Sequence, residues 1–266
     1  MESLESTSPE LALARQAADR AGETLMRFLR EGFTIREKAE SDLVSEADVT
    51  AEKIILEMIS DRFPGHAVLA EESQSEALRD SVPEHLWIVD PLDGTTNFAH
   101  GIPHFAVSIA YYRDGEPNCG MIWNPAREDR YVALRGQGAW YNGGRLHVGT
   151  QTALRDCLIG VGFYYDRGEM MEATLASIHQ LFKTGIQGIR RFGTASLDLA
   201  QVAQGRYAAF FEYQLSPWDF AAGQLLVEEA GGKVTTTRNA PLPFTQTTVL
   251  ASNGRLHETV LNIVRR

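Results

Sequence analysis

Acidic residues with the spacing of a cation site occur in the stretch WIVDPLDGTTNF, residues 87–98. An apolar strand leads to Asp90, and because Pro91 cannot continue the ladder of a central strand, we expect the chain to turn there. Asp93 follows within a turn that Gly94 permits, so both carboxylates and the carbonyls between them could face one space. Mg²⁺ prefers oxygen ligands of this kind. Since Asp, Pro and Gly are also common turn residues, a plain turn is the alternative.

Two further candidates stand beside predicted elements. Glu71 and Glu72 follow a strand, and because neighbouring strand residues face opposite sides, at most one of them should face the site. Asp48 lies three residues after Ser45 at the start of a predicted helix, a spacing that also fits a capping box. A solvated loop and a helix cap are therefore the structural alternatives for these acids.

The second half of the chain contributes another acidic pair. Glu212 ends a predicted strand, and Asp219 lies seven residues later in the first turn of a helix. The helix dipole favours an acid there for purely structural reasons, but a strand end beside a helix start is also where α/β proteins place ligands. His100 and His104 follow the first motif, and we interpret them as structural or surface residues because magnesium prefers oxygen.

The elements that must position these acids follow from hydrophobic periodicity and from glycine and proline signals. Helices are predicted over residues 9–30, 46–62, 169–183, 194–204, 218–230 and 256–264. Strands are predicted over residues 66–70, 86–89, 105–113, 119–123, 131–135, 158–163, 189–192, 208–212 and 248–251. This order indicates a mixed α/β protein with an antiparallel-rich first half and an alternating second half.

The order of predicted strands and helices changes near Gly149, which predicts two parts that pack tightly as one unit. Residues 1–149 form an N-terminal α+β part with most of the candidate ligands, and residues 150–266 form a C-terminal α/β part with Glu212 and Asp219. A chain of 266 residues is long enough for a large core.

Composition narrows the class of protein. The formal charge of −10 argues against binding nucleic acid through bulk charge. Cys119 and Cys157 are far apart, which makes a disulfide framework or a zinc site unexpected. Neither a signal peptide at residues 1–10 nor an apolar run long enough to span a membrane is evident. We therefore expect a cytoplasmic protein without a membrane partner.

Together these motifs resemble the inositol monophosphatase family, in the superfamily that includes fructose-1,6-bisphosphatase, over essentially the whole chain. Two signatures carry the resemblance: residues 87–98, and PWDFAAG at residues 217–223 followed by EEAGG at residues 228–232. Lys38-x₉-Asp48 and RFGTA at residues 191–195 add to it. The resemblance implies a layered αβαβα sandwich, a homodimer, and lithium-sensitive, Mg²⁺-dependent hydrolysis of a small phosphate monoester.

The resemblance also implies roles for individual residues. It implies two or three Mg²⁺ ions per site, held by Glu71, Asp90, the carbonyl of Leu92, Asp93 and Asp219. Glu71 and Thr95 would position the attacking water, with Asp48 hydrogen-bonded to Thr95. The implied substrate contacts are Asp93, the backbone N–H groups of Gly94 and Thr95, Ala195, Glu212 and Asp219.

The substrate is less closely specified than the chemistry. The sequence TTNF at residues 95–98 resembles the inositol phosphatase branch, which favours myo-inositol 1-phosphate. Another sugar phosphatase, such as a fructose-1,6-bisphosphatase, is the alternative enzyme. Three positions depart from the family pattern: Ser45 in place of Thr, Ala70 in place of Gly, and Tyr213-Gln214 where a Gly is typical. The last departure lies beside the expected substrate pocket.

An alternative from a different class is an accessory protein-binding factor in RNA synthesis, since some bacterial proteins that resemble this one act in that way. A binding-only protein would be expected to lose metal ligands. Every implied ligand is present in this sequence, which favours an active enzyme.

Overall fold

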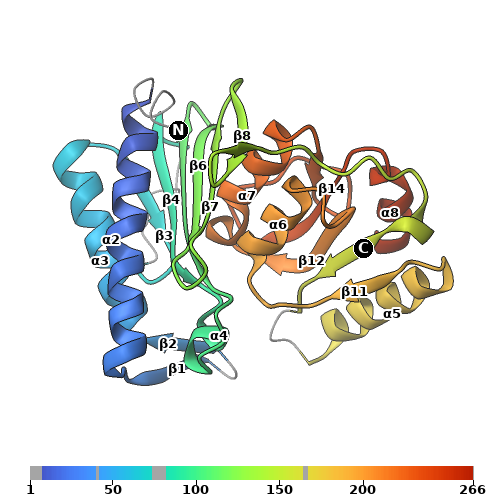
Figure 1. The fold of residues 1–266 in the computed structure, drawn as a ribbon, viewed down its shortest axis with the longest axis horizontal. Helices are drawn as coiled ribbons and strands as arrows, with labels where there is room; N and C mark the ends of the chain where they lie inside the picture. Colours follow the sequence, from blue (N-terminus) through green and yellow to red (C-terminus); the bar gives the residue numbers. More distant parts are fainter. Residues whose placement is uncertain (1–7, 40–41, 74–81, 164–166, 266) are drawn as a thin grey trace.

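The computed structural model describes residues 8–39, 42–73, 82–163 and 167–265, and these form alternating layers of helices and sheets (Figure 1). Helices α2 (Pro9–Glu31) and α3 (Glu46–Arg62) cover the outer face of a seven-stranded sheet. Helices α6 (Ala195–Ala203) and α7 (Pro217–Glu229) lie between that sheet and a five-stranded one. Helices α5 (Glu169–Lys183) and α8 (His257–Val264) cover the far side. The predicted αβαβα order is confirmed.

The seven-stranded sheet is antiparallel except at one edge. Its spatial order is β3 (Ala67–Ala70), β4 (His85–Asp93), β5 (Ala106–Arg113), β6 (Glu116–Asn124), β7 (Asp129–Leu134), β8 (Gly138–Tyr141) and β9 (Gly144–Arg145), with β3 parallel to β4. The predicted hairpin between β5 and β6 turns at Asp114 and Gly115, which have φ values of 53° and 78°. Two successive positive φ values match the right-handed twist of the flanking strands.

The predicted turn at Pro91 is wrong, because β4 continues through this residue to Asp93. On one side β3 pairs only as far as Val89, so the missing N–H of Pro91 breaks no bond there. On the other side the register shifts between Asp90 and Asp93, whose partners on β5 are only two residues apart. Two residues of β4 therefore oppose one of β5, and this bulge accommodates the proline.

The five-stranded sheet has the order β11 (Gly188–Arg190), β10 (Leu158–Val161), β12 (Ala209–Leu215), β14 (Thr247–Ser252) and β13 (Lys233–Thr235). β10 is parallel to both neighbours, whereas β14 is antiparallel to β12 and β13. The alternating strands and helices predicted for the second half are present. We retain as a proposal the division at residue 149, which lies in the connection between β9 and β10.

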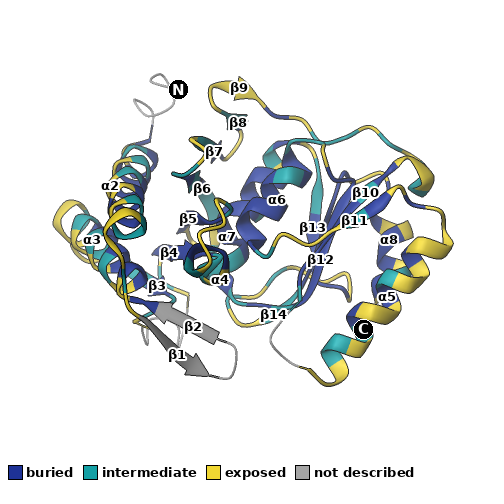
Figure 2. Cartoon of the chain, turned by 60° about the horizontal axis from the view of Figure 1, so that its bottom comes forward, coloured by how far each residue is buried: buried dark blue, intermediate teal, exposed yellow. Residues whose placement is uncertain are grey.

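Burial follows the layers, as Figure 2 shows. The middle helices α6 and α7 are largely buried, whereas α5 exposes one face. At the start of α2 the Ser8 hydroxyl accepts a hydrogen bond from the Leu11 N–H over 3.1 Å, with Pro9 in the first turn, as predicted. Among the described helices, none combines the length and apolar character needed to cross a membrane.

Seven short elements were not predicted. They are the hairpin of β1 (Ile35–Ala39) and β2 (Asp42–Ser45), helix α4 (Thr95–Ala99), the 3₁₀ helix η1 (Leu154–Asp156), the β8–β9 pair, and β13. Each is too short to show a clear hydrophobic period. Two predictions concern parts of the chain outside the described residues. They are the absence of a signal peptide, which was judged in part from residues 1–7, and the motif that includes the side chain of Lys38.

Candidate active site

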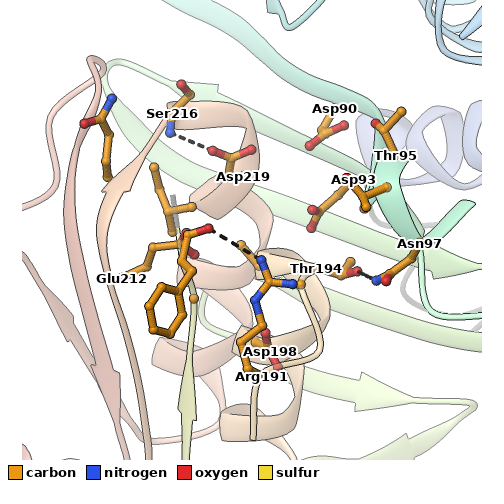
Figure 3. A pocket seen from close by; sticks show the side chains of 18 of the residues that line it. Asp90, Asp93, Thr95, Asn97, Arg191, Thr194, Asp198, Glu212, Ser216 and Asp219 are labelled. Carbon is orange, nitrogen blue, oxygen red and sulfur yellow. Dashed lines mark hydrogen bonds between the residues drawn. The ribbon is translucent and has the colours of Figure 1, made fainter. Parts of the chain in front are cut away.

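A cleft of about 760 Å³ is formed where the end of β4, the start of α6 and the β12–α7 connection meet. Figure 3 shows the acidic side chains that point into it from both halves of the chain. Nine of the ten predicted site residues line the cleft: Glu71, Asp90, Leu92, Asp93, Gly94, Thr95, Ala195, Glu212 and Asp219. The tenth, Asp48, is fully buried and contacts the site through Thr95.

Asp48 both caps helix α3 and accepts a hydrogen bond from Thr95. Its Oδ2 accepts hydrogen bonds from the N–H of Ser45, over 2.8 Å, and from the Ser45 hydroxyl, which completes the capping box of α3. Its Oδ1 lies 3.1 Å from the hydroxyl of Thr95, which donates to it. Burial raises the pKa of Asp48, and these hydrogen bonds oppose that increase. The carboxylate that caps α3 therefore also anchors the Thr95 hydroxyl by a hydrogen bond.

Thr95 is the first residue of α4 and follows a glycine that the backbone requires. Gly94 has φ 92° and ψ 38°, the left-handed conformation. A Cβ atom at Gly94 would lie 2.5 Å from Oγ1 of Thr194, so a larger residue would collide as well as strain the backbone. The Thr95 hydroxyl also lies 3.1 Å from the Leu92 carbonyl, which keeps it at the end of β4.

Backbone N–H groups orient the three aspartates. Asp90 accepts from the N–H of Leu92 over 3.0 Å, Asp93 from that of Ser196 over 2.7 Å, and Asp219 from that of Ser216 over 2.7 Å. The bond between Asp93 and Ser196 ties the first sheet to the first turn of α6. Each bond fixes one carboxylate oxygen and thus the direction of the side chain.

The acids in the cleft repel one another. Asp90 is 1% exposed, and its pKa is raised well above the ordinary value by burial first and then by Glu71, Asp93 and Asp219. The pKa of Asp219 is also raised well above the ordinary value, by burial, Asp93 and Glu71. Burial raises the pKa of Asp93 to about 6, although its bonds to Ser196 oppose the shift. Full ionisation of this group calls for a compensating cation.

The donor set fits Mg²⁺, because it consists of carboxylate and carbonyl oxygens. Among the described residues, no three acidic, imidazole or thiol groups converge closely enough to form a preformed metal cage. Mg²⁺ does not require one, since it retains several waters and is usually bound by one or two carboxylates together with substrate phosphate. The mutual repulsion of the acids is also consistent with side chains that draw together around a cation.

The prediction that at most one residue of the glutamate pair faces the site agrees with the structure. Glu71 lines the cleft. Glu72 is not part of the cleft lining, and its backbone N–H donates to the carboxylate of Glu52 on α3 over 2.8 Å. Of the two histidines near the motif, His100 is exposed, and the half-buried His104 packs against Phe192 with a ring separation of 5.0 Å.

Glu212 and Ala195, the residues predicted to contact the alcohol, both line the cleft. Glu212 is 8% exposed, and its pKa is raised to about 8, chiefly by burial, while nearby Arg191 opposes the shift. Tyr213 and Gln214, which depart from the family pattern, lie in different environments. Tyr213 faces the core, with its hydroxyl bonded to Ser177 and Val264, whereas Gln214 lines the cleft.

Asn97, Arg191 and Asp198 are among the residues of the cleft that were not predicted. Asn97 donates from Nδ2 to the carbonyls of His104 and Phe192, each over 2.8 Å, and so links the two halves. Asp198 stands in the apolar helix sequence ASLDLAQVA, and an acid on a buried helix was a signal that could have identified it. The contacts of Asn97 have no such local signal.

Comparisons with known proteins agree with this geometry. The model of the inositol monophosphatase family matches residues 6–266. Inositol-1-monophosphatase of Rhizobium meliloti is 41% identical, with 94% of each chain covered. Nus factor SuhB of Pseudomonas aeruginosa is 38% identical, with 97% of this chain and 96% of that protein covered.

Solved structures show the same similarity. The extragenic suppressor protein suhB from Bartonella henselae superposes with a TM-score of 0.90 at 40% identity, over 97% of this chain and 99% of that one. An IMPase/NADP phosphatase in complex with Mg²⁺ and phosphate has a TM-score of 0.82 at 28% identity, over 92% and 90% of the two chains.

Proposed function

This chain belongs to the inositol monophosphatase family, and from that premise we propose that it hydrolyses a small phosphate monoester with Mg²⁺ and water, with myo-inositol 1-phosphate as the substrate. The observation that carries the proposal is the set of acids Asp90, Asp93 and Asp219, which line one cleft and in which Asp93 raises the pKa of both others. Like charges gathered in this way are costly unless a cation binds among them.

The proposed ligands for two or three Mg²⁺ ions are Glu71, Asp90, the carbonyl of Leu92, Asp93 and Asp219. When bound, Mg²⁺ neutralises these carboxylates, lowers the pKa of a water molecule and offsets the charge of the phosphate and the departing alkoxide. A solved relative with Mg²⁺ and phosphate supports this choice of cofactor.

The residues of the chain would orient the attacking water. The Thr95 hydroxyl donates to Asp48, so its oxygen is left to accept a hydrogen bond from that water. Glu71, which lines the same cleft, would accept the proton as the water oxygen attacks phosphorus and the bond to the ester oxygen breaks. The departing alkoxide takes up a proton, which completes the products, an alcohol and inorganic phosphate.

Substrate would span the cleft from α4 to β12. The backbone N–H groups of Gly94 and Thr95 would bind phosphate oxygens, and the alcohol would contact Asp93, Ala195, Glu212 and Asp219. Because the carboxylates of Asp93, Glu212 and Asp219 are acceptors, an alcohol rich in hydroxyl groups suits this end of the cleft. This match supports inositol monophosphate over an apolar ester.

The proposal is tested by phosphate release from myo-inositol 1-phosphate, fructose 1,6-bisphosphate and histidinol phosphate, each with and without Mg²⁺. We expect Mg²⁺-dependent release with the highest kcat/KM for the inositol ester, and inhibition by lithium. A higher kcat/KM for fructose 1,6-bisphosphate would keep the chemistry and replace the substrate with the alternative sugar phosphate. Failure of folded, metal-loaded protein to hydrolyse any of the three would overturn the enzymatic proposal.

A second candidate function is that of a protein-binding accessory factor in RNA synthesis. The observation in its favour is the 38% identity to Nus factor SuhB over nearly the whole of both chains. The test is complementation of a deletion strain by Asp90→Asn, which should lack hydrolysis. Growth equal to that with the wild-type gene would support a role independent of catalysis, and failure to complement would assign the phenotype to the enzyme.

Three further properties complete the proposal. We expect a homodimer, measurable as a mass of twice 29.5 kDa by light scattering. We also expect a cytoplasmic location, and no direct binding to nucleic acid because the net charge is −10.

A further inference from the structure

Asp198 is a buried carboxylate that the proposed reaction does not use. It lies in α6, three residues after Ala195, and is 1% exposed. Among the described residues neither of its side-chain oxygens has a hydrogen-bond partner. A buried carboxylate without partners is costly, and such groups in folded proteins call for an explanation.

The surroundings of Asp198 contain more acceptors than donors. It lines the same cleft as Glu212, which faces it from β12, and both acids have raised pKa values with burial as the main cause (Figure 3). The cation that acts on both is Arg191, which opposes both shifts. Within the described ranges no ion pair joins Arg191 to either acid, and its Nη2 instead donates to the Phe163 carbonyl over 3.5 Å. Two acids therefore lack hydrogen-bond donors at this end of the cleft.

From this imbalance, and resting on the proposed function, we propose that Asp198 is a specificity-determining residue that accepts a hydrogen bond from a hydroxyl group of the leaving alcohol, beside Glu212. The missing donor is a neutral hydroxyl and not a further cation, because the guanidinium of Arg191 already acts on both acids and would repel a second positive charge. Since both carboxylate oxygens of Asp198 are shielded from solvent, the side chains that cover them must move when the alcohol binds.

The competing explanation is a structural pair with Tyr207. The Tyr207 hydroxyl is also buried without a partner, and Asp198 contributes to the rise in its pKa. A water molecule between the two groups would satisfy both without any ligand. Tyr207→Phe is therefore the matched control, since it removes that partner but does not touch the lining of the cleft.

The test compares kcat/KM for myo-inositol 1-phosphate and cyclohexyl phosphate, which share the ring and the ester but differ in hydroxyl groups. We expect Asp198→Leu to lower the preference for the inositol ester roughly 10- to 100-fold, mainly through KM, and Asp198→Asn, which keeps one acceptor oxygen, to retain most of it. Tyr207→Phe should leave the preference unchanged. Thermal unfolding would establish that each variant is folded.

The outcomes separate this inference from the proposed function. Hydrolysis of both esters with the same preference in wild type and in folded Asp198→Leu would overturn the role of Asp198 and leave the phosphatase proposal intact. Equal losses of stability in Asp198→Leu and Tyr207→Phe, with no change of preference, would assign Asp198 to the structural pair. Absence of turnover by the wild-type protein would instead contradict the proposed function, and a crystal structure with inositol phosphate would then test Asp198 directly by its distance to the ring hydroxyls.

Discussion

The hydroxyl of Thr95 donates a hydrogen bond to Oδ1 of Asp48 over 3.1 Å, although the two residues are 47 positions apart in the sequence. The same carboxylate closes the capping box of α3 through its other oxygen. The start of one helix is thereby joined to the end of the strand that carries Asp90 and Asp93. Helix capping and the proposed positioning of water therefore depend on one side chain, and mutations can separate them.

We expect Asp48→Ala to lower stability by about 1 kcal/mol, because it removes the cap, and to lower kcat about 100-fold, because the Thr95 hydroxyl loses its carboxylate acceptor and keeps only the Leu92 carbonyl. Ser45→Ala is the matched control, since it removes the N-cap hydroxyl but keeps the carboxylate beside Thr95. It should cost similar stability and little activity. Urea unfolding and steady-state kinetics check both variants, and equal losses of kcat would show that the cap alone matters.

Asn97 gives a prediction about the junction between the halves. Its Nδ2 bonds two carbonyls and also lies 3.2 Å from Oγ1 of Thr194, next to Ala195. Asn97→Ala should cost about 2 kcal/mol, because buried acceptors lose their donor. Asn97→Asp should cost more, since a carboxylate would face the same acceptors. Urea midpoints with an unchanged m-value would measure this, and a loss below about 0.5 kcal/mol in both variants would contradict the proposed link.

Repulsion among the acids predicts an opposite effect on stability at Asp90. Without metal, Asp90→Asn should raise the melting temperature by roughly 2–4 °C for each kcal/mol of relieved repulsion. Mg²⁺ should raise the melting temperature of the wild-type protein, because it binds the folded state, and should have little effect on the variant. Calorimetry with and without Mg²⁺ measures both changes. Equal stabilisation of the two proteins by Mg²⁺ would exclude Asp90 as a ligand.

His257 predicts the response of stability to pH. The ring is 1% exposed and lies 2.9 Å from the hydroxyls of both Thr235 and Ser252, and burial lowers its pKa to about 4. Between pH 6.5 and 4 the unfolded chain therefore binds a proton that the folded chain does not, and stability falls as the pH is lowered through this range. The loss amounts to about 3 kcal/mol and is complete near pH 4.

The control for this prediction is His257→Gln, which does not titrate. Unfolding free energies of the two proteins from pH 7 to pH 4 should converge as the wild type loses its advantage. Parallel curves would show that His257 does not contribute to the acid sensitivity.

Much of this fold could be predicted because its main elements carry strong local patterns. The bounds predicted for α3 and α5 match the structure, since each helix has a distinct apolar face and clear flanking signals. Nine predicted site residues line one cleft because they stand at strand ends and helix starts, where the layered fold gathers them. Their catalytic and binding roles are still predictions.

What could not be predicted depends on contacts between distant segments. The continuation of β4 past Pro91 requires a neighbouring strand that ends at Ala70 and a bulge against β5, neither of which is visible locally. The donors and acceptors around Asn97 come from residues up to 97 positions away. The isolation of Asp198 likewise follows from the packing of α6 against β12, and not from its own helix.

Mg²⁺-dependent hydrolysis is tested most directly by phosphate release from myo-inositol 1-phosphate by the wild-type protein and by Asp90→Asn, measured across a Mg²⁺ titration. We predict saturable Mg²⁺ dependence in the wild type and a loss of at least about 100-fold in the folded variant, because Asp90 is the most buried acid of the proposed metal set. Release that is independent of Mg²⁺, or equal in the two proteins, would contradict this prediction.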